Sequence, residues 1–365
     1  QVPLSQGLKK DSYSQRELFG PVVHLISYSD LDSALEVFNS TEYALTGGIF
    51  SQSQDDIDYL SSKMECGNLY INRPITGARV GIEPFGGFKL SGTGPKAGSF
   101  HYLSAFLVSP ISYPIIDQLA TSRPEDSLHE SSVLKLAGPS ELGVEERIPR
   151  VDRAIQYVIN NFEHLYQGIY GENKEVLIKF RQWANGHLKE FLTGDFNNIE
   201  IPGQLSFNNF SQSTKRVLFI SYEKRGYLSS LMQFLAAVSS GSGVSVACRN
   251  EDSFFWWTKL VGLFTRAGFS NRNIHVQQIS KDGLVKALHG KVASTVVVDG
   301  QINQSQEILN CLFNDKYDET DMIKVITPND APPINDFSGQ LQLFCYCRSF
   351  AVNTMRHGAP LELEI

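Results

Sequence analysis

Short apolar runs alternate with helical patterns between residues 216 and 328, and this alternation limits the possible folds more than any other feature of the chain. Segments with apolar residues at helical spacing separate the runs, and Ser253–Gly268 is the longest of them. Strands that alternate with helices form parallel sheets with helices on both faces. We therefore predict a doubly wound α/β unit. Its strands are expected at Arg216–Tyr222, Gly243–Arg249, Asn273–Ile279, Ser294–Gly300 and Met322–Pro328.

A similar alternation occupies the first hundred residues. Strand composition is found at Val22–Tyr28, Thr46–Phe50 and Asn68–Asn72, and helical spacing at residues 30–40 and Gln54–Lys63. We expect these strands to run close to parallel. Ligands of such sheets gather at the loops that leave the strand ends.

A long loop follows the last of these strands. Residues 71–99 contain seven glycines and three prolines, which excludes a helix interior or a central strand. Ordered loops of this length are usually functional. Its apolar side chains, Phe85 and Phe88 among them, argue against disorder. The sequence therefore predicts a ligand-binding loop.

Composition excludes several classes of protein. The net charge of −7 comes without a basic stripe, and no apolar run reaches the ~20 residues of a membrane span, so neither nucleic acid nor a membrane is indicated. Five scattered cysteines indicate reduced thiols and a cytoplasmic protein. Cys345 and Cys347 are interpreted as core thiols, so no metal site is predicted. Because the chain opens on Gln1, we expect a fragment whose upstream residues hold part of the chemistry.

The middle of the chain changes character. Residues 109–140 form a connector rich in proline, serine and charge. Val151–Tyr166 and residues 176–188 have strong amphipathic spacing and predict a helical hairpin. We interpret Asp195–Ser213 as a turn-rich link.

The motifs ELFGP, NRPITGA, PFGG and SGTGPKAGS follow one another between Arg16 and Leu107. In this order they resemble the closing third of the catalytic region of aldehyde dehydrogenases. The branch they resemble is the L-glutamate γ-semialdehyde (1-pyrroline-5-carboxylate) dehydrogenases, in particular the dehydrogenase module of bifunctional proline-catabolic flavoenzymes. This resemblance implies NAD as cofactor, glutamate γ-semialdehyde as substrate, and FAD in a proline dehydrogenase domain that is absent from this chain.

The resemblance also assigns residues. Glu17 would accept hydrogen bonds from the nicotinamide ribose, and Phe19 would pack beside the nicotinamide. Gly77 and Ala78 would anchor the substrate carboxylate through main-chain N–H groups, and Phe85 would line the aldehyde's methylene chain. SGTGPKAGS is interpreted as support for the anchor, since it lacks P-loop spacing.

The family's nucleophilic cysteine and its glutamate precede the ELFGP motif, so no catalytic residue is predicted in this chain. Cys66 is interpreted as structural because no base or cation adjoins it.

The resemblance divides the chain into three parts. Residues 1–120 would be the end of the catalytic domain, with residues 101–116 forming either an oligomerisation flap or a surface linker. Residues 121–210 would be linker and helical hairpin. Residues 211–365 resemble a degenerate aldehyde-dehydrogenase-like Rossmann domain with a terminal lid over an internal tunnel. Asp299 would stand where a dinucleotide needs its diphosphate, so NAD binding by this domain is predicted to be lost.

Three hypotheses about function follow. The first is a catalytic module that works with the upstream part of the same polypeptide, in a homo-oligomer. The second is a non-catalytic module for oligomerisation and channel closure. The third, a separate NAD-binding oxidoreductase on residues 210–365, requires measurable NAD binding.

Overall fold

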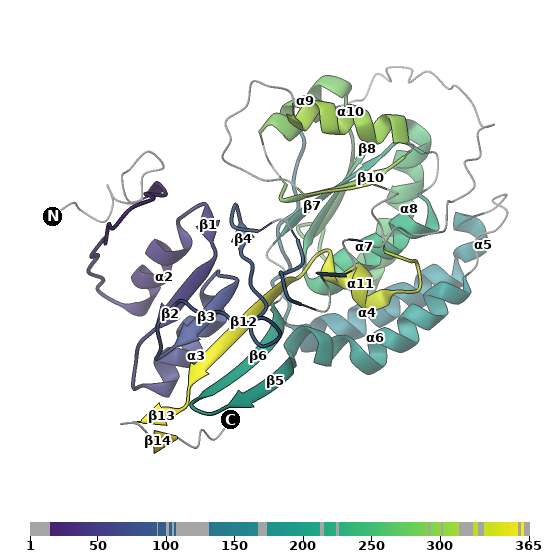
Figure 1. The fold of residues 1–365 in the computed structure, drawn as a ribbon. Coiled ribbons are helices and arrows are strands. Elements are labelled where there is room, and N and C mark those ends of the chain that lie inside the picture. Colours follow the sequence, from purple (N-terminus) through teal and green to yellow (C-terminus); the bar gives the residue numbers. More distant parts are fainter. Residues whose placement is uncertain are drawn as a thin grey trace. The chain divides into compact units, whose positions relative to one another are not determined.

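The structure is a computed structural model, shown in Figure 1. The chain divides into two compact units, and each is treated by itself. Unit 1 comprises Gln1–Leu107, Asp195–Asn209 and Cys347–Ile365, and unit 2 comprises Val108–Gly194 and Phe210–Tyr346. The structure describes residues 15–92, 94–99, 102–103, 106, 131–166, 174–211, 215–223, 226–290, 293–300, 302–313, 324–327, 332–356 and 359–360.

Unit 1 is built on a five-stranded sheet in the order β2-β3-β12-β6-β5. β3 (Asn68–Ile71) pairs in parallel with β2 (Thr46–Ile49) on one side and with β12 (Tyr346–Asn353) on the other. β5 (Asp195–Ile201) and β6 (Gln204–Ser211) form an antiparallel hairpin beside β12. Figure 1 shows the yellow β12 between β3 and β6. A strand near the chain's end therefore lies inside the sheet of the amino-terminal unit.

Two helices with side-chain caps accompany this sheet. In α2 (Leu31–Asn39) the Asp30 carboxylate accepts from the Ser33 amide at 2.8 Å, which satisfies an amide that the helix start leaves open. α3 (Gln54–Lys63) begins after Ser53, whose hydroxyl accepts from the Asp56 amide at 3.2 Å. Their apolar faces share one core with the sheet, formed by Leu35, Ile49, Ile57, Met64, Cys66, Leu69, Ile71 and Phe350.

Short antiparallel pairs complete unit 1. β1 (Tyr43–Ala44) pairs with β4 (Phe88–Lys89) within the long loop. β13 (Met355–Arg356) pairs with β14 (Ala359–Pro360) after β12.

Unit 2 is a doubly wound α/β fold, as the sequence predicts. Its five strands all run parallel in the order β11-β10-β7-β8-β9. The order reverses direction at β7, as it does between the two halves of a dinucleotide-binding fold. The strands are β7 (Arg216–Ser221), β8 (Gly243–Cys248), β9 (Ile274–Gln278), β10 (Thr295–Asp299) and β11 (Lys324–Ile326).

Helices cover both faces of this sheet (Figure 1). On one face lie α9 (Lys281–His289) and α10 (Ile302–Phe313), over an aliphatic core that includes Ile220, Leu284 and Ile308. On the other lie α7 (Leu228–Ser240) and α8 (Glu251–Ala267), whose buried aromatic rings pack in tilted and T-shaped pairs. Such pairs add about 1 kcal/mol each beyond burial.

The remaining helices of unit 2 are α4 (Val144–Asn160), α5 (Phe162–Leu165), α6 (Glu175–Thr193) and α11 (Phe337–Gln342). α4 and α6 form the predicted hairpin, joined by a bidentate pair in which Arg181 donates to Asp152 at 2.7 and 3.0 Å. The first helix of the hairpin begins seven residues earlier than predicted and breaks at Asn161, where the backbone leaves helical geometry. None of the helices in the described ranges is both long and apolar enough to cross a membrane.

Two sequence predictions are wrong. Val22–Tyr28 forms no strand: Val23 is 81% exposed and Leu25 94%, and a strand exists only as part of a ladder with a neighbour. Asp195–Ser213 is not a turn-rich link, because it holds the β5–β6 hairpin, which turns at Gly203 with φ +81°.

The sequence pattern did not predict the hairpin because several inward side chains of β6 are polar. Ser206 is fully buried and Asn208 is 1% exposed, so the usual alternation of apolar and polar residues is missing.

The division into units also differs from the expected boundaries. Residues 195–209 and 347–365 join the first unit because their strands extend its sheet. The expected flap at residues 101–116 lies almost entirely outside the described residues.

Candidate functional site

The candidate substrate anchor, Gly77–Ala78, lies in the long loop of unit 1 with its amides unused. Gly77 adopts φ +82°, a backbone conformation that is strained for any residue with a side chain. The space around it is open, since a Cβ there would meet nothing within 4 Å. Neither the Gly77 nor the Ala78 N–H donates a hydrogen bond to another described residue. Successive amides in such a turn form an anion-binding concavity. The geometry is therefore suited to a carboxylate.

Hydrogen bonds on both sides hold this turn. The Arg73 guanidinium donates to the Thr76 carbonyl at 3.3 Å, just before the turn. The Arg79 amide, just after it, donates to the Glu83 carboxylate at 2.6 Å. The two flanking positions are thus fixed while the two amides between them stay available.

Glu83 organises the loop, and sequence reasoning missed it. Its side chain is 1% exposed and lies 3.3 Å from the Arg79 guanidinium and 3.8 Å from that of Arg73. From β6, Ser206 donates to it at 3.2 Å and the Gln204 amide also donates to it. Burial alone raises the pKa of Glu83, but the bonds from Arg79 and Gln204 outweigh it and hold the pKa below its ordinary value. The available signal was a lone acid in the apolar run VGIEPFGG.

Phe85 lies a few residues beyond the anchor. Its backbone exchanges two hydrogen bonds with Ala97, both of 3.0 Å, which fixes its position across the loop. The ring is 40% exposed, and Val80 and Ile75 are 92% and 42% exposed. The loop therefore presents apolar side chains together with the anchor amides.

Lys96 is the residue through which the segment SGTGPKAGS holds the loop in place. Its ammonium group is buried and donates to the Gly67 carbonyl, to the Asn68 side chain at 3.2 Å and to Ser349 of β12 at 2.9 Å. Burial lowers the pKa of Lys96 to about 8. This cation ties the loop to the start of β3 and to the chain's last long strand.

The loop also packs against the backbone just before β3, and this contact requires glycine at position 67. A Cβ on Gly67 would lie 1.8 Å from the Gly86 carbonyl oxygen, so these two segments touch backbone to backbone.

Glu17 and Phe19 stand apart from the anchor. Both are exposed, Phe19 fully, and no hydrogen bond, ion pair or ring contact joins them to Gly77, Ala78 or Phe85 among the described residues. The candidate anchor residues all belong to one loop, and the candidate cofactor contacts lie on the exposed segment before α2.

The buried thiols Cys66, Cys248 and Cys345 are poor nucleophiles. Cys66 is fully buried, and burial raises its pKa to about 11. Burial likewise raises the pKa of Cys345 to about 12 and that of Cys248 further. Nucleophilic attack needs the thiolate. Cys66 therefore has the environment of a structural residue.

In unit 2, Asp299 lies at the start of α7, and helix starts are where α/β folds bind phosphate groups. It ends β10, is fully buried, and accepts hydrogen bonds from Ser221 at 2.7 Å and from Ser230 in the first turn of α7 at 2.6 Å. The Tyr227 amide, at the N-cap of α7, also donates to it at 3.4 Å. Burial raises the pKa of Asp299. A helix start that would hold a phosphate already holds a carboxylate, so these residues do not fit a dinucleotide.

Comparison with known proteins first defines a class. Residues 4–109 match the model of the aldehyde dehydrogenase family. This part of the chain, which carries the anchor loop, is therefore similar to members of that family.

Particular relatives are more specific. The chain is 49% identical over 104 residues to the bifunctional protein PutA of Rhizobium meliloti, which is 28% of this chain and 8% of the relative. It is 52% identical over 90 residues to 1-pyrroline-5-carboxylate dehydrogenase 2 of Bacillus subtilis, 25% of this chain and 18% of the relative. The chain thus spans at most about a fifth of these relatives.

One solved structure matches nearly the whole length of the chain. Proline utilization A (PutA) from Corynebacterium freiburgense matches with a TM-score of 0.51 at 20% identity, over 96% of this chain and 27% of that protein. At this identity the likeness shows the fold alone. It extends the similarity in fold beyond residues 4–109.

Proposed function

We propose that the chain is the carboxy-terminal part of an NAD-dependent L-glutamate γ-semialdehyde dehydrogenase within a bifunctional proline-catabolic enzyme. The observation that carries the proposal is that the Gly77 and Ala78 amides donate to no other described residue, within a segment about half identical to 1-pyrroline-5-carboxylate dehydrogenases. The product of the proposed reaction is glutamate.

Each residue has a role in this proposal. The Gly77 and Ala78 amides bind the substrate's α-carboxylate, as consecutive amides in a turn bind anions. Phe85 covers the methylene chain and keeps water from it. Arg73, Arg79 and Glu83 position the amides before substrate arrives, so that binding does not have to order the loop.

The cofactor NAD would accept hydride from the substrate. In this chain Glu17 would accept hydrogen bonds from ribose hydroxyls, and its exposed carboxylate has the chemistry for that contact. The nucleophile comes from the upstream part of the polypeptide, so we expect the isolated chain to be inactive.

A chimera tests this function. Residues 16–107 of this chain would replace the matching segment of the Bacillus subtilis dehydrogenase, which shares 52% identity over 90 residues. We expect the folded chimera to oxidise 1-pyrroline-5-carboxylate with NAD, while the 365-residue chain alone shows no turnover. Turnover by the isolated chain, or a folded chimera that binds NAD but never oxidises the substrate, would contradict the proposal.

A second function rests on a separate observation. β12 and the β5–β6 hairpin complete the sheet of unit 1, so the end of the chain is part of the aldehyde dehydrogenase fragment's own scaffold. A non-catalytic module for oligomerisation and for closing a substrate channel would use these strands. Arg348 and Ser349 in β12 belong to the terminal segment that would form the lid. Because the chimera carries only residues 16–107 and therefore lacks β12, an active chimera would separate this role from catalysis.

A further inference from the structure

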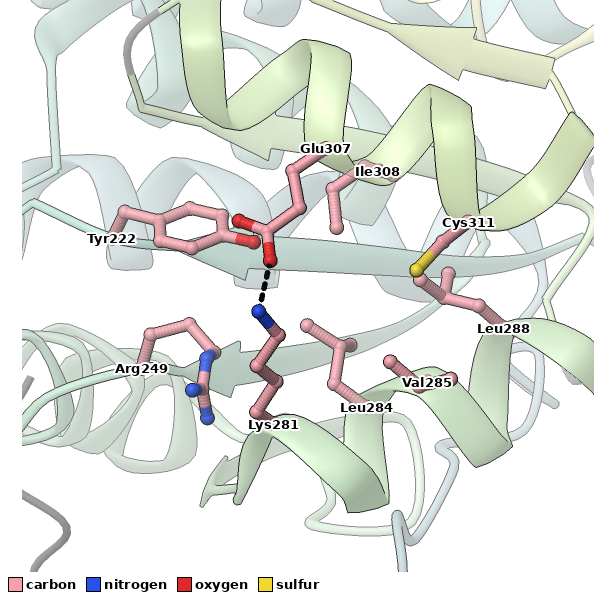
Figure 2. A pocket seen from close by; sticks show the side chains of 9 residues that line it. All are labelled: Tyr222, Arg249, Lys281, Leu284, Val285, Leu288, Glu307, Ile308 and Cys311. Atoms are coloured by element: carbon pink, nitrogen blue, oxygen red, sulfur yellow. Dashed lines mark ion pairs between the residues drawn. The ribbon is translucent and has the colours of Figure 1, made fainter. Parts of the chain in front are cut away.

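A pocket of about 120 Å³ lies in unit 2, at the carboxyl end of its parallel sheet. Tyr222 follows β7, Arg249 follows β8, and Lys281 opens α9. α10 supplies Glu307 and Cys311. Figure 2 shows these side chains with Leu284, Val285, Leu288 and Ile308 around the same space. Small-molecule sites of α/β proteins occur at this end of the sheet.

The pocket has an apolar part and a charged part. Leu284, Leu288 and Ile308 belong to the aliphatic core under α9 and α10, so they form a rigid apolar wall. At the other end the Lys281 ammonium lies 2.8 Å from the Glu307 carboxylate, drawn as the dashed line in Figure 2. The Tyr222 ring forms the side next to Glu307.

Arg249 leaves this charged end with one unbalanced positive charge. Its guanidinium donates to the Ile279 carbonyl, and no carboxylate in the described part of the chain forms an ion pair with it. Lys281 and Glu307 neutralise each other, so the pocket as a whole carries a net charge of about +1.

We propose that this pocket binds a small amphipathic monocarboxylate. Its carboxylate would pair with Arg249, and a short hydrocarbon tail would lie against Leu284, Leu288 and Cys311. A phosphate dianion is disfavoured because Glu307 lies at the same end. The space of about 120 Å³ is well below the ~300 Å³ of the smallest ordinary ligand pockets, so the ligand has to be small. The proposal is independent of the aldehyde dehydrogenase function.

Cys311 offers a local readout. It lines the pocket and is partly exposed, whereas Cys66, Cys248 and Cys345 are buried. Alkylation of Cys311 by iodoacetamide in the 365-residue chain would be followed by peptide mass spectrometry, with hexanoate as the probe. We expect saturable protection with half-effect at about 1 mM, the range for a ligand of this size. Hexanol and hexylammonium, which have the same tail, should protect far less.

Two variants test the charge argument in opposite directions. Glu307→Gln removes the anion beside the ligand and should tighten hexanoate binding about threefold to tenfold. Lys281→Gln leaves Glu307 unpaired and should weaken binding by a similar factor. Glu146→Gln makes the same charge change on an exposed position of α4 and should have no effect.

Four results would overturn the proposal. They are absence of protection by hexanoate, equal protection by hexanol, weaker binding after Glu307→Gln, and stronger protection by AMP than by hexanoate, which would assign a nucleotide site. Arg249→Gln should abolish protection by hexanoate if the variant folds. The tests above do not depend on that variant.

Discussion

In each unit of this protein a carboxylate is buried beside a backbone feature that can bind anions, and the two arrangements have opposite consequences. Glu83 in unit 1 has cationic and amide donors and a lowered pKa. Asp299 in unit 2 has hydroxyl and amide donors, and burial raises its pKa. Glu83 holds a turn whose own amides stay available, whereas Asp299 accepts the hydrogen bonds of the helix start itself. A buried acid can thus prepare an anion site or occupy one.

The largest effect is expected when the Glu83 carboxylate of unit 1 is removed. Glu83→Gln should lower the free energy of unfolding by about 3 kcal/mol, because it leaves two arginines without their buried partner. Urea unfolding at pH 7 would measure it. Glu65→Gln, which removes a partly exposed pair with Lys89 at 2.9 Å, is the matched control and should cost about 0.5 kcal/mol.

The pH dependence of that loss has a definite sign. Because the pKa of Glu83 is lowered in the folded chain, its stabilisation is present at neutral pH and is lost as the pH falls through the folded pKa. The gap between wild type and Glu83→Gln should therefore close in acid. A gap that stays constant would show that shape, not charge, explains the loss.

The next effect concerns the anchor turn. In the chimera, Gly77→Val should raise the KM for 1-pyrroline-5-carboxylate about tenfold, because a branched residue resists φ +82° and displaces the amides. Steady-state kinetics would measure it. Gly81→Val, at φ +79° with equally open surroundings, carries the same backbone strain away from the anchor. Equal increases for both variants would remove Gly77 from its proposed role.

A smaller effect tests Asp299. The pKa of Asp299 is raised in the folded chain, so its ionisation there is less favourable than in the unfolded chain. The free energy of unfolding therefore falls as the pH rises above the ordinary pKa of aspartate. Asp299→Asn removes that cost, so the variant should be more stable than wild type by about 1 kcal/mol at pH 8 and nearly equal to it in acid. Unfolding curves from pH 5 to pH 8 would show it. If the stability of the wild type instead rose relative to that of Asp299→Asn with increasing pH, the raised pKa of Asp299 would be contradicted.

The smallest expected effect is an absence of binding. Because Asp299 fills the start of α7, calorimetric titration of the chain with NAD should give no saturable heat at about 1 mM. A micromolar Kd would instead support an NAD-binding oxidoreductase on residues 210–365.

Much of the fold could be predicted from the sequence. The bounds of α3, Gln54–Lys63, match the prediction, and the five parallel strands of unit 2 lie where valine-rich runs predict them. These elements have apolar faces at regular spacing, a signal that is local. The anchor loop was identifiable for a similar reason, since its glycines and prolines exclude regular structure.

Other features depended on residues far apart in the chain. Gln204 and Glu83 are 121 positions apart, and Lys96 and Ser349 are 253. Both contacts bury polar groups, which pattern rules assign to the surface. The β5–β6 hairpin and the role of Glu83 were therefore not predicted, because hydrogen bonds to the Glu83 carboxylate come from Gln204 and Ser206 on β6, far away in the sequence.

By itself the sequence determined the α/β class, most of the helices and strands, the position of the anchor loop and the likeness to aldehyde dehydrogenases. The tertiary structure alone decided that β12 lies between β3 and β6, and that Glu83, Lys96 and Asp299 are buried. The physical reason is that apolar periodicity acts within one element. A buried charge, in contrast, is tolerated only where several distant donors or acceptors converge on it.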